Sequence, residues 1–341
     1  MHRVGLDGLP ETNENAVGNP VNAAITLVNS LHQTADSKGL EMLNCNWHQT
    51  VNLLYSGNSV VGRCSEDYSV GKLQKAKAHL YHSYASIPWL GQIAWGDHDM
   101  FHSNDKFAGR MMAVSKAISG GPVYLSDDPV HFKDENITPL CYNNGELLRP
   151  IAPASPIPDD LFLEMEDTSL YRVIAPLANS SAVMVVYNFA ENNQKKKLSI
   201  SEDDYKNASG MIQPYPGEWE VPAEGIYLYD WYEQQGQLLN EPFTTEMEGF
   251  CDKLFIITPV KNGWSVIGRP DKYLSAAAYE LLETTSQKIK IEMKENGPLI
   301  IWCKDKTPLS ANFKFSSLEN GLWAGSLVKE NLERVYTITS K

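Results

Sequence analysis

The chain has 341 residues, 43% of them hydrophobic, so it can bury one large core or two of medium size. Its 42 acidic residues outnumber its 29 basic residues, and the formal net charge of -13 argues against nucleic acid as a partner. The five cysteines include no C-x-x-C pair, which disfavours a disulfide framework and a thiolate zinc site, and no apolar stretch approaches the roughly 18 residues of a membrane span. We therefore expect no membrane partner and a reducing compartment, with the cytoplasm favoured.

Short apolar runs alternate with helical patterns in the first half of the chain. Asn19 and Pro20 predict the start of a helix that Gly39 ends, and further helices are predicted over residues 73–87 and from Asp105 to Gly120. Strands are predicted over residues 3–7, 40–46, 59–64, 91–95 and 122–126. Because strands that alternate with helices indicate parallel βαβ units, we expect an α/β fold with about five such units.

Polar residues cluster where these predicted strands end. They are Asp7, Asn44 with Trp47, Arg63 with Asp67, Asp97 with Asp99, and Asp127. Strand ends carry the catalytic groups of a (β/α)8 barrel, whereas a dinucleotide-binding Rossmann sheet needs a glycine-rich turn opening a helix, and SGGP (119–122) instead precedes a strand. The pattern favours a partial (β/α)8 TIM barrel. A barrel closes only with eight strands, so we infer that the chain is the carboxy-terminal part of a larger protein.

The character of the sequence changes near residue 150. The segment RPIAPASPIPDD carries four prolines, which resist regular structure, and it predicts a linker or a wrapping segment. Later segments such as 181–190, 254–260 and 298–303 are β-branched and aromatic and are separated by turns. We therefore predict barrel residues at 1–150, a linker at 151–168 and an antiparallel β-sandwich domain at 169–341.

The stretch WGDHDMFHS (95–103) has three interpretations. A metal site would use its aspartates and histidines, but alternate residues of a strand point to opposite sides, so Asp97 and Asp99 can share a direction while His98 faces away. The aspartates could instead cap turns and backbone amides. In a sugar pocket the carboxylates would accept hydrogen bonds from hydroxyl groups while an aromatic ring covers the apolar side of the sugar.

Asp67 is the best candidate for a general acid, since it follows a predicted strand beside Tyr68 and Cys64. The alternative is a plain ion pair with Arg63. Asp7 could supply the second carboxylate of a glycosidase pair, or could be a simple turn residue. Cys45 and Cys64 fit small core residues better than nucleophiles, because burial raises the pKa of a thiol.

The motifs GRCSEDY, WGDHDMFHS and AISGGPVYLSDDP, in this order and spacing, resemble the raffinose synthase and seed imbibition protein branch of glycoside hydrolase family 36. YRVIAPLAN (171–179) continues the resemblance into the sandwich that follows the barrel in this family. The resemblance implies Asp67 as the acid/base and Asp7 as the nucleophile, although Gly5 replaces the lysine of the family's nucleophile motif. It also implies sugar contacts from Arg63, Asn44, Cys45, Trp47, Trp95, Asp97 and Asp99.

The resemblance implies a retaining hydrolase that acts on α-galactosides, namely the raffinose-family oligosaccharides, and needs no cofactor or metal. A galactosyltransferase of the raffinose synthase type would use the same two carboxylates and a sugar as acceptor. A noncatalytic carbohydrate-binding or structural remnant is the third possibility, favoured by Gly5 and by the absent barrel strands.

Overall fold

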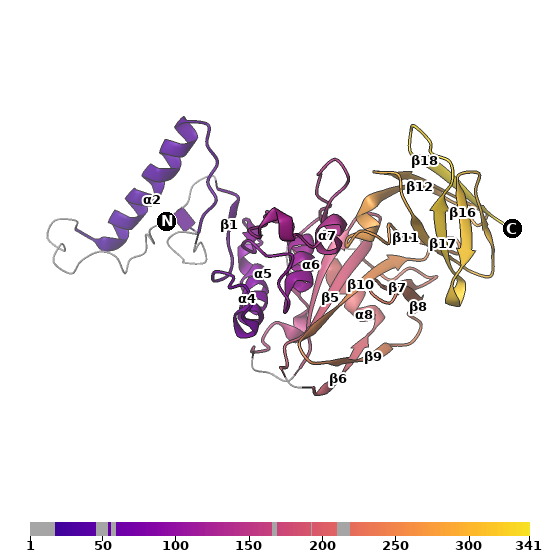
Figure 1. The fold of residues 1–341 in the computed structure, drawn as a ribbon, viewed down its shortest axis with the longest axis horizontal. Coiled ribbons are helices and arrows are strands. Elements are labelled where there is room, and N and C mark those ends of the chain that lie inside the picture. Colours follow the sequence, from indigo (N-terminus) through magenta and orange to yellow (C-terminus); the bar gives the residue numbers. More distant parts are fainter. Residues whose placement is uncertain (1–17, 46–53, 56–58, 166–168, 192, 210–218) are drawn as a thin grey trace.

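A computed structural model describes residues 18–45, 54–55, 59–165, 169–191, 193–209 and 219–341, and Figure 1 shows their arrangement. The described residues up to 150 form helices joined by turns and short parallel strands, and the described residues after them form mainly antiparallel strands. The main helices of the first part are α2 (Pro20–Ser37), α4 (Leu73–Ala85), α5 (Ile87–Leu90), α6 (Gly109–Ser119) and α7 (Asp134–Ile137). None of the helices in the described ranges is long and apolar enough to cross a bilayer.

Helix α2 begins and ends where its local sequence predicts. The Asn19 side chain accepts a hydrogen bond of 2.9 Å from the Val21 amide, and Pro20 occupies the first turn. Gly39 follows the helix with φ 65°, a conformation that suits glycine. In Figure 1 this helix projects from the rest of the chain, and Leu27 and Leu31 on it are exposed.

The strand segments of the first part pair in parallel, as expected. Strand β1 (Val61–Arg63) pairs with β2 (Trp95–Asp97), and two single parallel bridges join Asn44 to Gly62 and Phe101 to Leu125. The described residues thus contain short pieces of a parallel sheet. The five-unit partial barrel stays a prediction, and the expected strand at 3–7 lies outside the described residues.

Three strand predictions need correction. Residues 40–45 are not a buried strand, because Leu40 and Leu43 are 59% and 45% exposed and only the Asn44 bridge joins this segment to β1. Residues 87–94 form α5 and turns, since Pro88 favours the first turn of a helix, so the predicted strand 91–95 begins only at Trp95. The predicted strand 122–126 is reduced to one bridge.

Helices α4 and α6 lie between the parallel strands and the large antiparallel sheet (Figure 1). The Tyr84 hydroxyl in α4 lies 2.9 Å from the Ser115 hydroxyl in α6 and 3.2 Å from the Tyr187 hydroxyl in the sheet. These contacts join the two halves of the chain into one core. The sequence predicted one apolar face for helix α6, but the structure buries nearly every side of this helix.

The second half starts with a six-stranded antiparallel sheet. Its strands, in spatial order, are β3 (Ser155–Pro156), β4 (Tyr171–Leu177), β5 (Ser181–Asn188), β10 (Cys251–Pro259), β7 (Ile226–Asp230) and β8 (Gln235–Leu238). Alternate residues of β5 enter different cores: Val185 and Tyr187 face α4 and α6, whereas Met184 and Val186 face the other side. Strand β3 comes from the proline-rich segment, so this segment wraps onto the sheet.

Further antiparallel pairs complete the second half. The strands β6 (Lys195–Ile200) and β9 (Phe243–Glu248) pair beside α8 (Glu202–Lys206). Two four-stranded sheets follow: β11 (Trp264–Gly268), β14 (Leu299–Cys303), β17 (Leu322–Leu327) and β16 (Phe313–Ser317), and β12 (Tyr279–Thr284), β13 (Lys288–Met293), β18 (Val335–Ser340) and β15 (Pro308–Leu309). The expected antiparallel architecture is present, but it comprises a large sheet in addition to a two-sheet sandwich.

Candidate functional site

The buried guanidinium of Arg63 is the centre of the polar cluster at the ends of β1 and β2. Its Nη1 lies 2.9 Å from Asp99 Oδ1 and its Nη2 lies 3.0 Å from Asp67 Oδ1. Burial opposes the charge of Arg63, but Asp99 and Asp97 outweigh it and raise the pKa of the guanidinium. One cation therefore holds two carboxylates from consecutive strand ends.

Asp97 and Asp99 both face Tyr124, but a turn after β2 brings Asp99 there, because the strand itself ends at Asp97. The Asp99 amide donates a 2.8 Å hydrogen bond to Asp97 Oδ1, and the backbone of Asp99 has φ 64°, which aspartate adopts more readily than most residues. The Tyr124 hydroxyl lies 2.9 Å from Asp97 Oδ2 and 3.4 Å from Asp99 Oδ1. Burial raises the pKa of Asp97, although its hydrogen bonds and Arg63 act in the other direction.

His98 lies on the other side of this strand end. Its Nδ1 is 3.1 Å from the Ser115 hydroxyl, and its ring meets Tyr84 edge to face at 5.1 Å between ring centroids. Burial lowers the pKa of His98 well below its usual value. Across the residues with described positions, no three His, Cys, Asp or Glu side chains are grouped to hold a metal ion.

Lys116 lies fully buried behind the two aspartates. Its ammonium donates to the His98 carbonyl, which also accepts a 2.8 Å hydrogen bond from Nε2 of His79. Burial lowers the pKa of Lys116 to about 8, and the charges of Asp99 and Asp97 oppose this shift. This lysine is absent from the site residues expected from the sequence, and its one signal there is an isolated cation within the apolar run MAVSKAI of α6.

The free energy of unfolding should rise with pH because of Lys116. Its pKa of about 8 in the folded chain lies below the usual 10.5, so the unfolded chain binds more protons between these values and folding gains up to about 3 kcal/mol as pH rises from 8 to 10.5. Urea unfolding across this pH range should show the increase in the free energy of unfolding for the wild type. The increase should be absent in Lys116→Met. The exposed control Lys304→Met should keep it, and a Lys116→Met curve parallel to the wild type would contradict the prediction.

Asp67 differs from the other carboxylates in its access to solvent. Its side chain is 82% exposed, whereas those of Asp99 and Arg63 are each 8% exposed. The ion pair with Arg63, which was the alternative role expected for Asp67, is therefore present, and it leaves one oxygen of Asp67 free of the guanidinium. A carboxylate held in this way is oriented and still open to a ligand.

Asn44 joins the cluster through the backbone, since its carbonyl accepts a 2.8 Å hydrogen bond from the Arg63 amide. Its Oδ1 lies 3.2 Å from Nε2 of His32. The buried Nδ2 of Asn44 and Nε of Arg63 have no hydrogen-bond partner among the residues that the structure describes. Two unpaired donors on neighbouring segments can bind the oxygen atoms of a ligand.

The remaining predicted site residues are placed differently. Trp95 begins β2 and lies against Gly120 at the end of α6, two residues before the carboxylate cluster. Cys64 is buried, and burial raises its pKa to about 12, whereas Cys45 is exposed, so the prediction of a core role is wrong for Cys45. Cys45 is exposed because its segment is joined to β1 only by the bridge between Asn44 and Gly62, so no neighbouring strand covers it.

Asp7, Gly5 and Trp47 lie outside the described residues, so the position of the expected nucleophile stays a prediction. Tyr124 is a contact that sequence reasoning missed. It lies in PVYLS, which was assigned only as a strand, and an aromatic hydroxyl after a glycine pair offered no specific signal for a role beside Asp97.

A second buried carboxylate supports the loop that carries Asp67. Asp105 accepts hydrogen bonds from the Tyr68 hydroxyl and from the Gly71 amide at 2.7 Å. The predicted helix cap is also seen in part, since Asp105 Oδ1 accepts from the Phe107 amide at 2.8 Å, although α6 itself begins at Gly109. Asp127, the last predicted strand-end residue, accepts from the Ser103 amide and hydroxyl at 2.9 and 2.6 Å.

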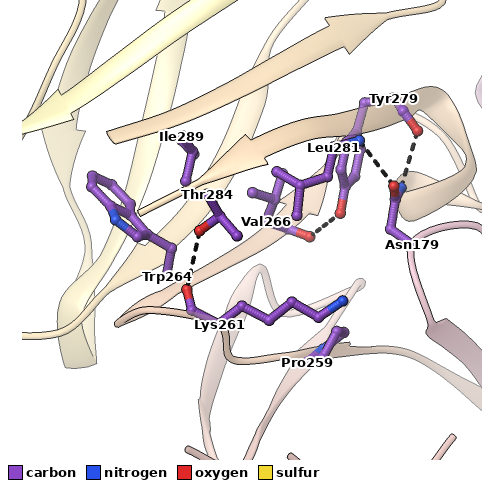
Figure 2. A pocket seen from close by; sticks show the side chains of 9 residues that line it. All are labelled: Asn179, Pro259, Lys261, Trp264, Val266, Tyr279, Leu281, Thr284 and Ile289. Atoms are coloured by element: carbon purple, nitrogen blue, oxygen red, sulfur yellow. Dashed lines mark hydrogen bonds between the residues drawn. The ribbon is translucent and has the colours of Figure 1, made fainter. Parts of the chain in front are cut away.

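A small hollow in the second half offers no comparable chemistry (Figure 2). Its volume is about 10 Å³, which is about the minimum for one water molecule. Two of its polar side chains are already paired: the Tyr279 hydroxyl donates to the Val266 carbonyl at 2.7 Å, and Asn179 binds the backbone of Tyr279 and Leu281. This hollow is part of the sandwich core.

Comparisons with known proteins agree with the resemblance in the sequence. Residues 14–310 match the family model described as "Raffinose synthase or seed imbibition protein Sip1". A probable galactinol–sucrose galactosyltransferase 6 of Arabidopsis thaliana is 24% identical, and the match covers 82% of this chain and 41% of the relative. A galactinol–sucrose galactosyltransferase of Pisum sativum is 33% identical over 67% of this chain and 31% of its own length. The chain thus spans less than half the length of these relatives.

The solved structure of α-galactosidase I from Mortierella vinacea resembles this chain with a TM-score of 0.50. The match has 14% sequence identity and covers 72% of this chain and 65% of that one. At this identity the likeness concerns the fold alone.

Proposed function

Because the chain belongs to the raffinose synthase or seed imbibition protein family, we propose that it contributes the acid/base side of a site that transfers a galactosyl group between sugars. One observation carries the proposal. The buried Arg63 is anchored by the buried Asp99 and holds the exposed Asp67 at the end of β1. Such an arrangement fixes the direction of a carboxylate and keeps it accessible to substrate.

Asp67 would act twice in this reaction. In the first step its protonated carboxyl group gives a proton to the glycosidic oxygen while a second carboxylate attacks the anomeric carbon, so that the leaving sugar departs and a galactosyl ester forms. In the second step the Asp67 carboxylate takes a proton from the acceptor hydroxyl, whose oxygen displaces the ester. Asp7 is proposed as the second carboxylate on the family resemblance alone.

The other polar groups would bind the sugar. Asp97 and Asp99 are committed to Arg63 and Tyr124, so they fit a role in positioning Arg63 and accepting sugar hydroxyls better than a role in proton transfer. The unpaired donors Asn44 Nδ2 and Arg63 Nε can donate hydrogen bonds to hydroxyl or ring oxygens of the sugar. No step requires a cofactor.

Transfer to a sugar is favoured over transfer to water because the Arabidopsis and Pisum relatives are named as galactosyltransferases. Hydrolysis of α-galactosides is the second candidate, favoured by the fold likeness to an α-galactosidase. The same two carboxylates serve both reactions, and the acceptor alone differs.

The ratio of the two products tests this choice. The protein, with any residues that flank this chain, should be incubated with galactinol at fixed concentration and with increasing sucrose. We expect a galactosylated trisaccharide to exceed free galactose as sucrose rises, measured by anion-exchange chromatography. Release of galactose that sucrose leaves unchanged, without a trisaccharide, would identify a hydrolase instead.

A further inference from the structure

A polar groove lies on the six-stranded sheet, outside the cluster around Arg63. Its volume is about 290 Å³, and it lies over the face of β7, β8 and β10 beside β9. Leu228 and Phe255 form its buried floor, and the partly exposed Phe243 of β9 meets Phe255 edge to face at 5.6 Å between centroids. An aromatic side chain therefore borders a groove whose floor is apolar.

Amide and charged side chains of the sheet form the walls of this groove. Gln235 and Gln237 stand opposite Asp230 and Leu228 in the register of β8 with β7. Their side-chain amides make no hydrogen bond with any other residue in the described part of the chain. Each amide can donate and accept at once, as a sugar hydroxyl group can.

The charges in the groove are largely balanced. Lys253 lies 2.9 Å from Asp230 and 3.7 Å from Glu233, so one ammonium faces two carboxylates. An anionic ligand gains nothing from a cation that is already paired, and a mainly apolar ligand would leave the amides unpaired. A neutral ligand rich in hydroxyl groups matches the lining best.

A second hollow of about 420 Å³ extends the groove across the edge strand β8. The two hollows share Gln237 and Asn320. Asn320 Nδ2 donates to the Gly236 carbonyl at 3.3 Å and so occupies part of the free edge of β8, which disfavours pairing with an added peptide strand. Together the hollows reach the size range of sites for small ligands, roughly 300–1,000 Å³.

We propose that this β8 groove, defined by Gln235, Gln237, Phe243, Lys253 and Asn320, binds a neutral oligosaccharide away from the reacting centre. Phe243 covers an apolar sugar face, and the two glutamine amides bind hydroxyl groups. The identity of the sugar as one related to the substrate rests on the proposed function, whereas the existence of the groove does not. A groove of this kind would retain an oligosaccharide on the protein between reactions.

Nuclear magnetic resonance of the side-chain amides tests the proposal in the whole protein. The ¹⁵N-labelled amide signals of Gln235 and Gln237 are assigned by their loss in single alanine variants, and raffinose is then titrated. We expect both signals to shift in a saturable way, while the signal of the exposed Gln287, in the turn between β12 and β13, stays fixed. The double variant Gln235→Ala/Gln237→Ala should weaken binding in the groove about 30-fold, because it removes two hydrogen bonds that each contribute roughly 1 kcal/mol. The side-chain amide signal of Asn320 reports the remaining binding in this variant.

The outcomes separate this inference from the proposed function. Saturable shifts that persist in Asp67→Asn support the groove even if galactosyl transfer is absent. Static Gln235 and Gln237 signals, or equal shifts at Gln287, overturn the groove even where transfer is observed. Shifts produced by an extended peptide and not by raffinose would overturn it in favour of strand pairing.

Discussion

Replacing Asp67 by asparagine is expected to slow transfer from galactinol by about 100- to 10,000-fold, the usual contribution of a general acid/base. The amide cannot give a proton to the departing sugar or take one from the acceptor, yet it is close in size and can still accept from Arg63 at the position now 3.0 Å away. The turnover of the full protein on galactinol with sucrose measures the effect. An activated aryl galactoside should lose less in its first step, since its leaving group needs no proton.

The adjacent carboxylate provides a matched control. Glu66 is exposed and pairs only loosely with Lys75, at 3.6 Å, so Glu66→Gln should keep transfer within about twofold of the wild type. Sodium azide should restore turnover of the aryl galactoside by Asp67→Asn, because azide attacks the galactosyl ester without needing a base. Asp67→Asn with wild-type turnover on galactinol would remove Asp67 from the mechanism.

Gly120→Ala should unfold at a much lower urea concentration than the wild type, because its free energy of unfolding should be about 2–5 kcal/mol lower. Gly120 ends α6 with φ 68°, and an added methyl group would lie 2.2 Å from the Trp95 ring. The substitution therefore combines an unfavourable backbone conformation with a clash against the first residue of β2. Displacement of β2 would also move Asp97, so we expect the activity to fall with the stability.

Gly71→Ala isolates the backbone part of this effect. Gly71 has φ 70°, nearly the same as Gly120, but no atom lies within 4 Å of the position that an added methyl group would occupy. The free energy of unfolding of Gly71→Ala should be about 1–2 kcal/mol lower than that of the wild type, which is the cost of the left-handed conformation alone. Equal losses in the two variants would contradict the packing of Trp95 on Gly120.

Local signals in the sequence were sufficient for several elements. Asn19, Pro20 and Gly39 act through contacts within a few residues, so the limits of α2 follow from sequence alone. The alternation of apolar runs and helices predicted parallel pairing, which β1 and β2 show. The expected common direction of Asp97 and Asp99 is seen at Tyr124, although a turn with a left-handed Asp99, and not the strand period, produces it.

Contacts between distant segments decided the rest. The segments 40–45 and 122–126 are as apolar as true strands, but a strand requires a hydrogen-bonded neighbour along its length, and each has only one bridge to the described residues. For residues 87–94, the local preference of Pro88 for a helical turn outweighed the apolar pattern. The proline-rich segment became part of a sheet only because β4 was available as its partner.

The candidate site divides in the same way. The sequence alone placed Arg63 and Asp97 at the ends of β1 and β2, because residue type and the apolar pattern of a strand are local properties. Only the tertiary structure decided that Arg63 joins Asp67 to Asp99, that Tyr124 reaches Asp97, and that Lys116 is buried behind them. Ion pairing and burial depend on which segments meet in space, and 27 residues of sequence separate Tyr124 from the carboxylate it contacts.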